Sequence, residues 1–490
     1  MTTEGTRRLS PAPSLESLVI ATYGLLGVRL GARSLADNSA FLHLRTGIDM
    51  VRHGVLPAIP RVDPYSFTAR GEPWVVQSWL PSAVVGWVHR IGGPEAVVVL
   101  AGLTMAGLAV LVASLARTGD VRRTVVAAGA ALLVGGPFWT PRPLLAGLLC
   151  LGLTIWVVER GKSPWWLVPI AWVWANSHGS FPLGLAWMLL RTFGDAADAR
   201  SRPRLAPVGW LAGGLVLGAL NPLGPRLLFF PLELGEKREI FQTVTEWRTA
   251  DFQRPDGVVA LVGLVLAALI LTRRPLPWRH ALPVGAFLGL GLLAQRNLAP
   301  LGVVIAPALA ASLRVDAPAS AAADDPSRIP LAPVPDATAT RVPIVFAGVL
   351  VVLAALFLVT AATRPPFDFS SYPAQTVRVL EERGRLGEAH RVLTRDTVGN
   401  YLELRLGREA NVFIDDRVDM YPLEVSRDYA KLLRGEDLAA ILGKWQIDTV
   451  LWRTDDPFVD RVTAAVDWPG ISHNRDGWTV LTRDCPCPRG

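Results

Sequence analysis

Residues 37–80, DNSAFLHLRTGIDMVRHGVLPAIPRVDPYSFTARGEPWVVQSWL, follow the first apolar run of the chain, and the rest of the sequence is organised around them. Within them, residues 40–53 repeat apolar side chains at helical spacing, which predicts an amphipathic helix lying along a membrane surface. Prolines end this helix, and GEPWVVQSWL returns the chain to the bilayer with two tryptophans at headgroup depth. We therefore expect an outer loop, residues 36–80, that is too polar to cross the membrane.

The composition is that of an integral membrane protein. The chain has 490 residues, of which 51% are hydrophobic and only 19% are charged. Its formal net charge is +7, but the basic residues alternate with apolar runs instead of clustering on one soluble face. This alternation is typical of topology signals, and it argues against nucleic acid as a partner.

Successive apolar runs predict a polytopic α-helical membrane protein with about eleven transmembrane helices. A transmembrane domain takes residues 1–313, and the last transmembrane helix takes residues 342–363. Residues 79–91 are apolar but short, and we expect them to lie in the outer interface. The expected spans are 15–35, 95–116, 124–139, 144–158, 164–177, 181–190, 205–220, 257–271, 281–294, 298–313 and 342–362.

The distribution of arginine predicts the orientation in the plasma (inner) membrane. Arg7 and Arg8 precede the first span, which places the N-terminus in the cytoplasm and the outer loop on the outside. Residues 314–341 are rich in Pro, Ala and Asp, a composition that predicts a flexible cytoplasmic linker. The last span then delivers residues 364–490 to the outside.

Residues 364–490 differ in character from the rest of the chain. The segments HRVLTRD, ANVFIDD and IDTVLWR have the pattern of short strands, and residues 399–406, 424–433 and 438–443 have the pattern of helices. Alternation of the two predicts a small extracytoplasmic α/β domain.

Polar residues gather at the outer ends of the expected spans. Charged groups at a membrane edge are costly, and they mark a functional site by default. Because several occur on one side, we expect a single outward-facing cavity that binds substrate. Its candidate residues are Arg142, Asn176, His178, Asn221, Glu246 and Arg296.

Each of these residues has a structural alternative. Asn176 and His178 suit hydrogen bonding at a helix end, and a lone histidine rarely binds a metal. Asn221, before Pro and Gly, suits a turn. Arg296 suits either a lipid phosphate or a substrate phosphate, and Glu246 suits an ion pair with an arginine of its own loop.

Two aspartates of the outer loop are the catalytic candidates. Asp37 stands at the outer end of the first span, where a partly desolvated carboxylate can act as general base on an acceptor hydroxyl. Its alternative role is the N-cap of the following helix. Asp63 is the second acidic candidate, with turn initiation in VDPYSF as its alternative role. Further candidates for substrate binding from this loop are His43, Arg45, Trp74 and Gln77.

The motif FIDDRVDMY of the C-terminal domain carries four more charged residues. Asp415, Asp416, Arg417 and Asp419 follow an expected strand, a position at which α/β domains often bind ligands. We expect Asp415 and Arg417 to contact a sugar or an acceptor. Packing against the membrane domain is the alternative.

The outer loop resembles the first outer loop of the GT-C superfamily of membrane glycosyltransferases, including the protein O-mannosyltransferases and aminoarabinose transferases. The resemblance rests on an acid after the first span, a helix ending at 54–57 and a re-entry at 73–80. In those enzymes an acidic pair opens the loop, whereas here the pair is Asp37 and Asn38. The re-entry reads Glu72, Pro73 and Trp74 in place of Lys-Pro-Pro.

The chain also resembles bacterial GT-C-like membrane proteins of unassigned substrate. The shared patterns are HLRTG, DPYSFT, W-x-N-x-HG, NPxG, EW and V-F-I-D-x-R-x-D-x-Y, at residues 43–47, 63–68, 174–179, 221–224, 246–247 and 412–421. Both resemblances imply a polyprenyl-phosphate sugar as donor and Asp37 at the catalytic acidic position. Metal dependence stays open, with a divalent metal as one possibility.

These observations together predict a glycosyltransferase of the outer face, acting on an envelope glycan or protein acceptor in contact with membrane lipids. Nucleotide sugars do not occur outside the plasma membrane, and the sequence has no G-x-x-x-x-G-K-[ST] loop. Two alternatives stay open: a transporter or flippase of a lipid-linked saccharide, and a non-catalytic scaffold of an envelope-synthesis complex.

Overall fold

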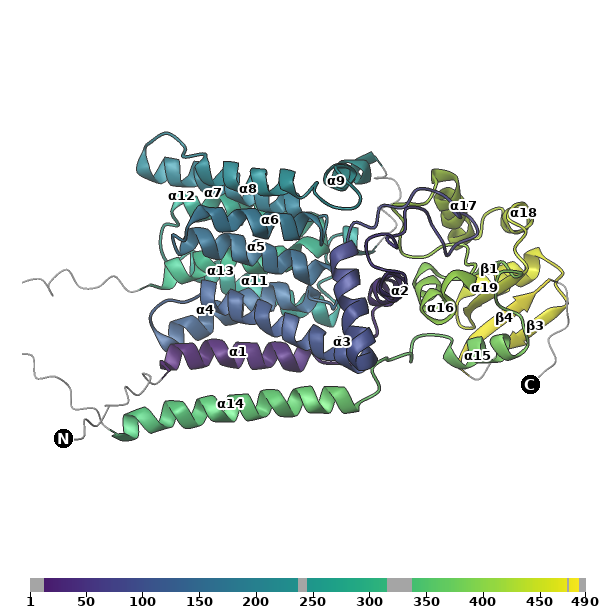
Figure 1. Cartoon of the computed structure of the whole chain (residues 1–490), viewed down its shortest axis with the longest axis horizontal. Coiled ribbons are helices and arrows are strands. Elements are labelled where there is room, and N and C mark those ends of the chain that lie inside the picture. Colours follow the sequence, from purple (N-terminus) through teal and green to yellow (C-terminus); the bar gives the residue numbers. More distant parts are fainter. Residues whose placement is uncertain (1–12, 237–244, 315–336, 474–475, 484–490) are drawn as a thin grey trace, which may run out of the picture.

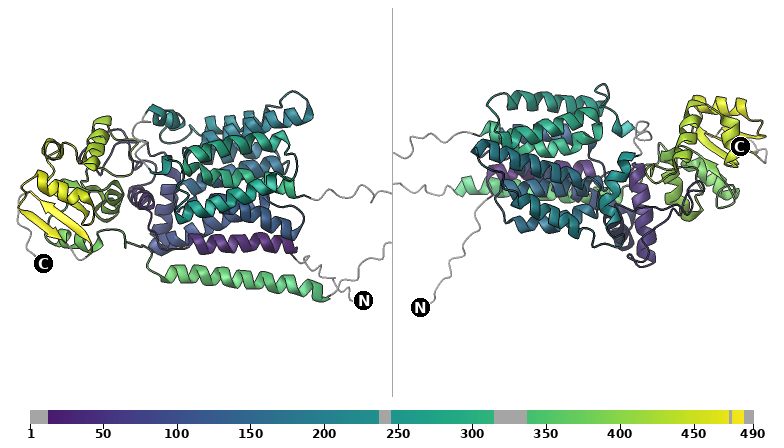
Figure 2. Two further views of the ribbon diagram at one scale, coloured as in Figure 1. Left: turned by 180° about the vertical axis from the view of Figure 1, so that it is seen from behind. Right: turned by 90° about the horizontal axis from the view of Figure 1, so that it is seen from above.

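The computed structural model describes residues 13–236, 245–314, 337–473 and 476–483. Figure 1 shows a bundle of long helices with a smaller mixed domain attached at one end. The views from behind and from above show the same arrangement (Figure 2). Arg7, Arg8 and most of the expected linker 314–341 lie outside the described residues, except that residues 337–341 already belong to a helix.

Every expected span coincides with a helix of the bundle. A helix satisfies the backbone donors and acceptors of each apolar run internally. Four of these helices do so although Pro94, Pro283, Pro307 and Pro343 lie inside them. The bundle helices are α1 (Leu15–Gly31), α3 (Trp79–Leu115), α4 (Val121–Gly135), α5 (Leu144–Glu159), α6 (Leu167–Ala175), α7 (Phe181–Ala199), α8 (Ala206–Leu217), α11 (Pro255–Leu271), α12 (Trp278–Leu293), α13 (Leu298–Leu313) and α14 (Ala337–Thr363).

Four described segments are long and apolar enough to cross a membrane: Trp79–Leu115, Val121–Phe138, Gln295–Leu313 and Val342–Thr363. Only 6% of the last of these is buried inside the protein, so its apolar side chains need an apolar surrounding. The apolar helices α5, α8 and α11 are shorter. The protein is thus mostly helical with about four candidate spans, and the count of about eleven crossings stays a prediction.

Helix α3 bends where Gly92 and Gly93 leave helical geometry. Gly93 has a φ of 69°, a conformation that residues with a Cβ rarely adopt. Figure 1 shows one limb of α3 running across the end of the bundle and the other limb running along it. The crossing limb contains residues 79–91, and its direction suits the expected interfacial position.

Helix α2 (Asn38–Arg52) confirms the amphipathic helix predicted for residues 40–53. It crosses the first limb of α3 at Gly47 and Gly86. A Cβ atom added at Gly47 would overlap the carbonyl oxygen of Ser82, and one added at Gly86 would overlap the carbonyl of Gly47. The HLRTG motif therefore ends in glycine at a point where two helix backbones touch.

The C-terminal domain contains a four-stranded sheet of order β1-β2-β4-β3. Strand β1 pairs with β2 in parallel, and the other two pairs are antiparallel. The strands are β1 (Val392–Leu393), β2 (Thr449–Arg453), β3 (Gly470–His473) and β4 (Trp478–Thr482), and the helices are α15 (Ala374–Glu382), α16 (Asp396–Leu406), α17 (Leu423–Arg434), α18 (Leu438–Lys444) and α19 (Pro457–Ala465).

The three helices expected in this domain correspond to α16, α17 and α18, and two of the expected strands correspond to β1 and β2. The segment ANVFIDD is not a strand, because only Val412 forms isolated bridges, with Val392 and with Ser66 of the outer loop. Strands β3 and β4 were not expected. In the sequence, the polar residues 474–477 separate the apolar residues of these two strands, so no hairpin was expected there.

The outer loop fills the space between the bundle and the C-terminal domain. After α1, the backbone of Leu35 pairs with the segment that follows α14, through hydrogen bonds to Pro366 and from Asp368. The ring of Phe41 packs edge-on against Phe367, at a centroid distance of 6.0 Å, and against neighbouring aromatic rings. These contacts fix the outer loop as one wall of the site.

Candidate functional site

A cavity of about 1000 Å³ lies where the end of the bundle, the outer loop and the C-terminal domain meet. Helix α2 and the re-entry segment 74–78 form one wall, and the start of α5 and the loop between α6 and α7 form a second. Residues 395–397, Ile414 and residues 416–419 form a third. The short helices η3 (Thr245–Trp247) and η4 (Gln295–Asn297) complete the rim. All three parts of the chain therefore contribute to one site.

Arg142 joins two carboxylates at the edge of this cavity. Its Nε atom lies 2.7 Å from both oxygens of Asp37, and its Nη1 atom pairs with Glu246. Burial lowers the pKa of Arg142, but the two carboxylates outweigh burial and raise it above the ordinary value. The guanidinium thus stays charged, and its Nη2 atom has no hydrogen-bond partner among the described residues.

Asp37 is the N-cap of α2 as well as the partner of Arg142. Its Oδ1 atom accepts hydrogen bonds from the backbone amides of Ser39, at 3.0 Å, and Ala40, at 3.4 Å. It does not belong to the lining of the cavity. The expected functional position and its structural alternative therefore coincide in one residue, with the carboxylate facing Arg142 and away from bulk solvent.

Asp416 is a half-buried carboxylate that lines the cavity. Its Oδ2 atom accepts from Nδ2 of Asn38 at 2.9 Å, and its Oδ1 atom accepts from Nδ2 of Asn400 at 2.5 Å. Burial raises the pKa of Asp416 to about 7 and outweighs the hydrogen bond from Asn400, which lowers it. The charge of Asp415 raises the pKa further, and that of Arg142 lowers it. Asp416 can therefore exchange a proton near neutral pH.

Two neutral histidines stand beside these groups. Burial lowers the pKa of His43 to about 4 and that of His178 to about 3. The hydroxyl of Ser82 donates to a backbone carbonyl, so Nδ1 of His43 must carry the hydrogen it shares with Ser82 at 2.9 Å. Nδ1 of His178 instead accepts from the amide of Ser180 at 3.2 Å, which places the hydrogen of this ring on Nε2.

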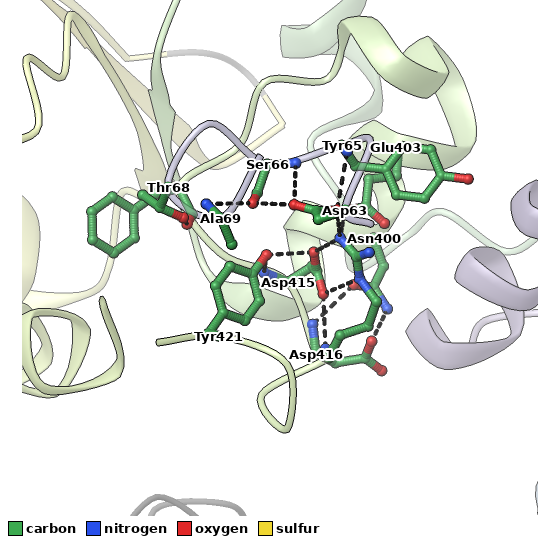
Figure 3. A network of polar contacts seen from close by, with 12 residues as sticks. Asp63, Tyr65, Ser66, Thr68, Ala69, Asn400, Glu403, Asp415, Asp416 and Tyr421 are labelled. Atoms are coloured by element: carbon green, nitrogen blue, oxygen red, sulfur yellow. Dashed lines mark hydrogen bonds and ion pairs between the residues drawn. The ribbon is translucent and has the colours of Figure 1, made fainter. Parts of the chain in front are cut away.

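Figure 3 shows a network of polar contacts that joins the outer loop to the C-terminal domain. At its centre is a buried cluster of charged side chains. Arg417, whose side chain is 4% exposed, pairs with Asp63 of the outer loop at 2.8 Å and with Asp415 at 2.5 Å. Its guanidinium also reaches Glu403 at 3.3 Å. Burial and the charge of Asp415 raise the pKa of Glu403 well above its ordinary value, so Glu403 keeps its proton. The hydroxyl of Tyr421 donates to Asp415 at 2.6 Å.

Arg296 is the second cation of the cavity. Its guanidinium lies 4.4 Å from the ring centre of Trp247, a cation–π contact that orients it. No ion pair or hydrogen bond joins its guanidinium to any residue in the described ranges. It lies within electrostatic reach of Glu246 and Arg142. Two arginines thus face one region of the cavity.

Apolar side chains form another part of the cavity lining. Helix α5 contributes Leu144, Gly147, Leu148 and Leu151 to its lining, spaced as one face of a helix. These residues cover two turns, about 10 Å along the helix axis. Pro300 of α13 and two residues of α7 continue this surface. The cavity lining therefore combines charged side chains with the apolar face of a bundle helix.

Eight of the expected site residues line this cavity, from six different segments of the chain. The structure places these residues where the sequence predicted, but it does not test what each of them does. They are His43, Trp74, Gln77, Arg142, His178, Glu246, Arg296 and Arg417.

The structure places the other six expected residues outside the lining. Asp37 and Asp415 contact lining arginines, as described above, and Asp63 holds the outer loop by accepting hydrogen bonds from Tyr65 and Ser66. Arg45 pairs with Asp49 one helical turn away. The remaining two, Asn176 and Asn221, bond at helix ends and in a turn.

The side chains of Asn176 and Asn221 show why a polar residue at a span end need not face a ligand. Asn176 accepts from the indole of Trp79 at 2.9 Å and donates to the carbonyl of Trp172 at 2.8 Å, which ties the re-entry segment to α6. Asn221 bonds only to its own turn, at Gly218 and Gly224. Glu246 pairs with Arg142 rather than with Arg254, which pairs with Asp256.

Three acidic residues of the cavity, Asp396, Asp416 and Asp419, were not among the expected binding residues. Asp416 and Asp419 stand in the FIDDRVDMY motif, which indicated acidic residues there without distinguishing them. Asp396, at the start of α16, lines the cavity and exchanges hydrogen bonds with Tyr429. Burial raises its pKa. No sequence signal pointed to Asp396.

Metal ligands are a separate matter. Within the ranges that the structure describes, no group of three or more His, Cys, Asp or Glu residues is arranged to hold a metal ion. Comparison of the chain with models of known protein families gives no match, and comparison with curated proteins gives none either.

Proposed function

We propose that this protein is a membrane glycosyltransferase that takes a sugar from a polyprenyl-phosphate donor and transfers it to a cell-envelope acceptor. The observation that carries this proposal is the mixed lining of the cavity, which contains both arginines and the leucine face of α5. A polyprenyl-phosphate sugar likewise combines a charged head with a long apolar chain. The resemblance of the outer loop to GT-C enzymes implies the same donor.

Arg142 and Arg296 are the proposed contacts of the donor phosphate. Both line the cavity, and both present guanidinium nitrogens without a hydrogen-bond partner among the residues the structure describes. Guanidinium groups match phosphate oxygens in geometry and stay charged at any physiological pH. Glu246 and Asp37 hold Arg142 in place, so that little ordering is needed when the donor binds.

Asp416 is the proposed general base. We assign this role to Asp416 rather than to Asp37 because Asp37 is engaged by Arg142 and two backbone amides and does not line the cavity. A carboxylate with a pKa of about 7 exchanges protons readily near neutral pH. Asn38 stands where related enzymes have their second acid, and its side chain binds Asp416. Asp416 thus supplies a carboxylate at that place from another part of the chain.

The proposed reaction is a single displacement. Ionised Asp416 accepts the proton of an acceptor hydroxyl, whose oxygen attacks the anomeric carbon of the donor sugar. The bond between that carbon and the phosphate oxygen breaks, and the phosphate oxygen keeps the electron pair. Arg142 and Arg296 stabilise the charge that develops on the leaving polyprenyl phosphate. The products are the glycosylated acceptor, polyprenyl phosphate and protonated Asp416.

The proposed setting is the plasma membrane with a GT-C-type bundle of about eleven spans, the N-terminus in the cytoplasm and the C-terminal domain outside. Helices α1 and α14 both begin at the end of the bundle away from the C-terminal domain, which suits this orientation (Figure 1). A transporter would need polar groups through the depth of the bundle, whereas the charged residues of this cavity lie at one end of the bundle. A scaffold would have no use for two cavity arginines that keep guanidinium nitrogens without a hydrogen-bond partner among the described residues.

The test is transfer of label in membranes that contain or lack the protein. Polyprenyl-phosphate mannose and polyprenyl-phosphate aminoarabinose, labelled in the sugar, are the two donors that the resemblance suggests. We expect label to leave the lipid fraction and enter an envelope fraction with one of them. Movement of intact labelled lipid across the membrane would indicate a flippase, and no change with either donor would contradict the proposal.

A further inference from the structure

A second pocket, of about 340 Å³, lies at the other end of the bundle from the cavity. The ends of α3, α5 and α13 and the start of α12 surround it, together with the loop that follows α11. None of its lining residues belongs to the site described above. Its lining includes five arginines: Arg117, Arg160, Arg274, Arg279 and Arg314.

At least two of the five arginines of this pocket have no ion pair among the described residues that would balance their charge. Glu159 is the carboxylate in the lining, and it pairs with Arg191. Arg117 is held by Glu16 at 2.5 Å. The guanidinium groups of Arg279 and Arg314 have no ion pair or hydrogen bond within the part of the chain that the structure describes. An anion in the pocket would therefore meet at least two free guanidinium groups.

The floor of the pocket holds a buried hydroxyl without a partner. Ser312 is 6% exposed, and its Oγ atom makes no hydrogen bond in the described structure. A hydroxyl in the last turn of a helix usually bonds to the preceding turn, and a buried hydroxyl without a partner is destabilising. His280, also buried, lies beside it in the lining, with Nδ1 at 4.0 Å from Glu159. A ligand oxygen would satisfy the hydroxyl.

Basic residues at one end of a membrane protein are expected from orientation alone. Orientation requires arginines in loops, but it does not require them to converge on a concave pocket above an unpaired buried hydroxyl. Trp278, which precedes the lining residue Arg279 in the chain, is 56% exposed. Tryptophan prefers the headgroup region of a bilayer, which suits a pocket at the depth of lipid phosphates.

We propose that this pocket binds a phosphate group, with Arg279 and Arg314 as its cationic contacts and Ser312 as a hydrogen-bond donor. The phosphate belongs either to the headgroup of an anionic glycerophospholipid or to a soluble phosphate. Basic pockets between helices at the cytoplasmic side of membrane proteins suit anionic headgroups. The site is separate from the transferase cavity, so the proposal does not depend on the activity assigned there.

The test measures the unfolding temperature of the full chain in detergent. One arm compares micelles containing phosphatidylglycerol with micelles containing phosphatidylcholine, and a second compares inorganic phosphate with chloride at equal ionic strength. We expect phosphatidylglycerol or phosphate to raise the unfolding temperature above its own reference. A shift with phosphatidylglycerol alone identifies a lipid headgroup, and a shift with inorganic phosphate identifies a soluble ligand.

The double variant Arg279→Gln/Arg314→Gln should lose this shift, with apparent affinity weakened about tenfold or more. Arg434→Gln/Arg453→Gln is the matched control, since it removes the same charge from exposed positions of the C-terminal domain. Ser312→Ala should weaken binding while all the arginines remain. The proposal is overturned if neither phosphatidylglycerol nor inorganic phosphate raises the unfolding temperature above that of its reference. It is also overturned if the double variant keeps the full rise in unfolding temperature.

Discussion

Nδ2 of Asn38 lies 2.9 Å from Oδ2 of Asp416, although 378 positions separate the two residues in the chain. The side chain of Asn400 closes this contact, because its Nδ2 atom donates both to Asp416 and to the backbone carbonyl of Asn38. The first residue of α2 and the C-terminal domain thus hold one carboxylate at the wall of the cavity. The following predictions test what this arrangement does.

Transfer should depend on the ionisation of Asp416. Because burial raises its pKa to about 7, the basic form is lost as the pH falls below 7, and the rate should fall about tenfold per pH unit there. Above pH 8 the rate should level off. The measurement is kcat/KM for the labelled donor between pH 5 and 9. A flat profile across this range would exclude Asp416 as the base.

The variant Asn38→Asp should move this profile. A second carboxylate beside Asp416 disfavours its ionised form, and the donated hydrogen bond is lost as well. The acidic limb should therefore shift to higher pH, by about one unit or more. Asn38→Ser, which adds no charge, is the matched comparison and should shift the limb less. An unchanged midpoint in Asn38→Asp would show that Asp416 does not control the profile.

Asp37→Asn separates the two roles of Asp37. Asparagine caps helices about as well as aspartate, so the unfolding temperature should change little through the cap. The ion pair with Arg142 is lost, and Arg142 is then less firmly held for the phosphate, so KM for the donor should rise. Asp37→Ala should show the same kinetic defect and lose about 1 kcal/mol more stability. Full activity in Asp37→Asn would remove Asp37 from the site.

The Arg417 cluster should be essential for stability. Arg417→Met leaves Asp63 and Asp415 buried without their cation, which typically costs about 3–5 kcal/mol. The measurement is the free energy of unfolding in detergent. Arg453→Met is the control, because its partner Asp455 is exposed and such pairs contribute about 0–1 kcal/mol. Similar losses in both variants would show that the cluster does not tie the outer loop down.

The crossing of α2 and α3 should tolerate no side chain at Gly47. Gly47→Ala places a methyl group against the carbonyl of Ser82, and such overpacking costs about 1–3 kcal/mol or more. Gly107→Ala is the matched control on α3, because a Cβ there meets nothing within 4 Å and alanine favours helix. Gly47→Ala should lower the unfolding temperature, and Gly107→Ala should not. The opposite order would contradict the close approach.

Much of the fold could be predicted from the sequence because apolar runs and helical spacing are local signals. The amphipathic helix and the helices of the bundle follow from them, as do α16 to α18. The hairpin of β3 and β4 was missed, since its strands are short and irregular in pattern. The segment around Val412 was taken for a strand because its apolar residues are those of a strand, but its partners are single bridges to Ser66 and Val392.

The site was predictable only in part, for a similar reason. Polar residues at the outer span ends were recognised as costly, and several of them do line one cavity. Asn176 and Asn221 produce the same signal while serving helix ends and a turn, because a side-chain amide satisfies the backbone at either place. The special position of Asp416 arises from contacts with Asn38 and Asn400, and no local pattern reports contacts between distant segments.

The central claim is that Asp416 and the arginines of the cavity transfer a sugar from a lipid phosphate. The most direct measurement is release of polyprenyl phosphate from labelled donor by purified protein in liposomes, with acceptor membranes added. We expect release with the wild type and with the exposed-site control Asp455→Asn, and a loss of about 100-fold or more in Asp416→Asn. Equal release by Asp416→Asn and the wild type would contradict the account, as would no release by either.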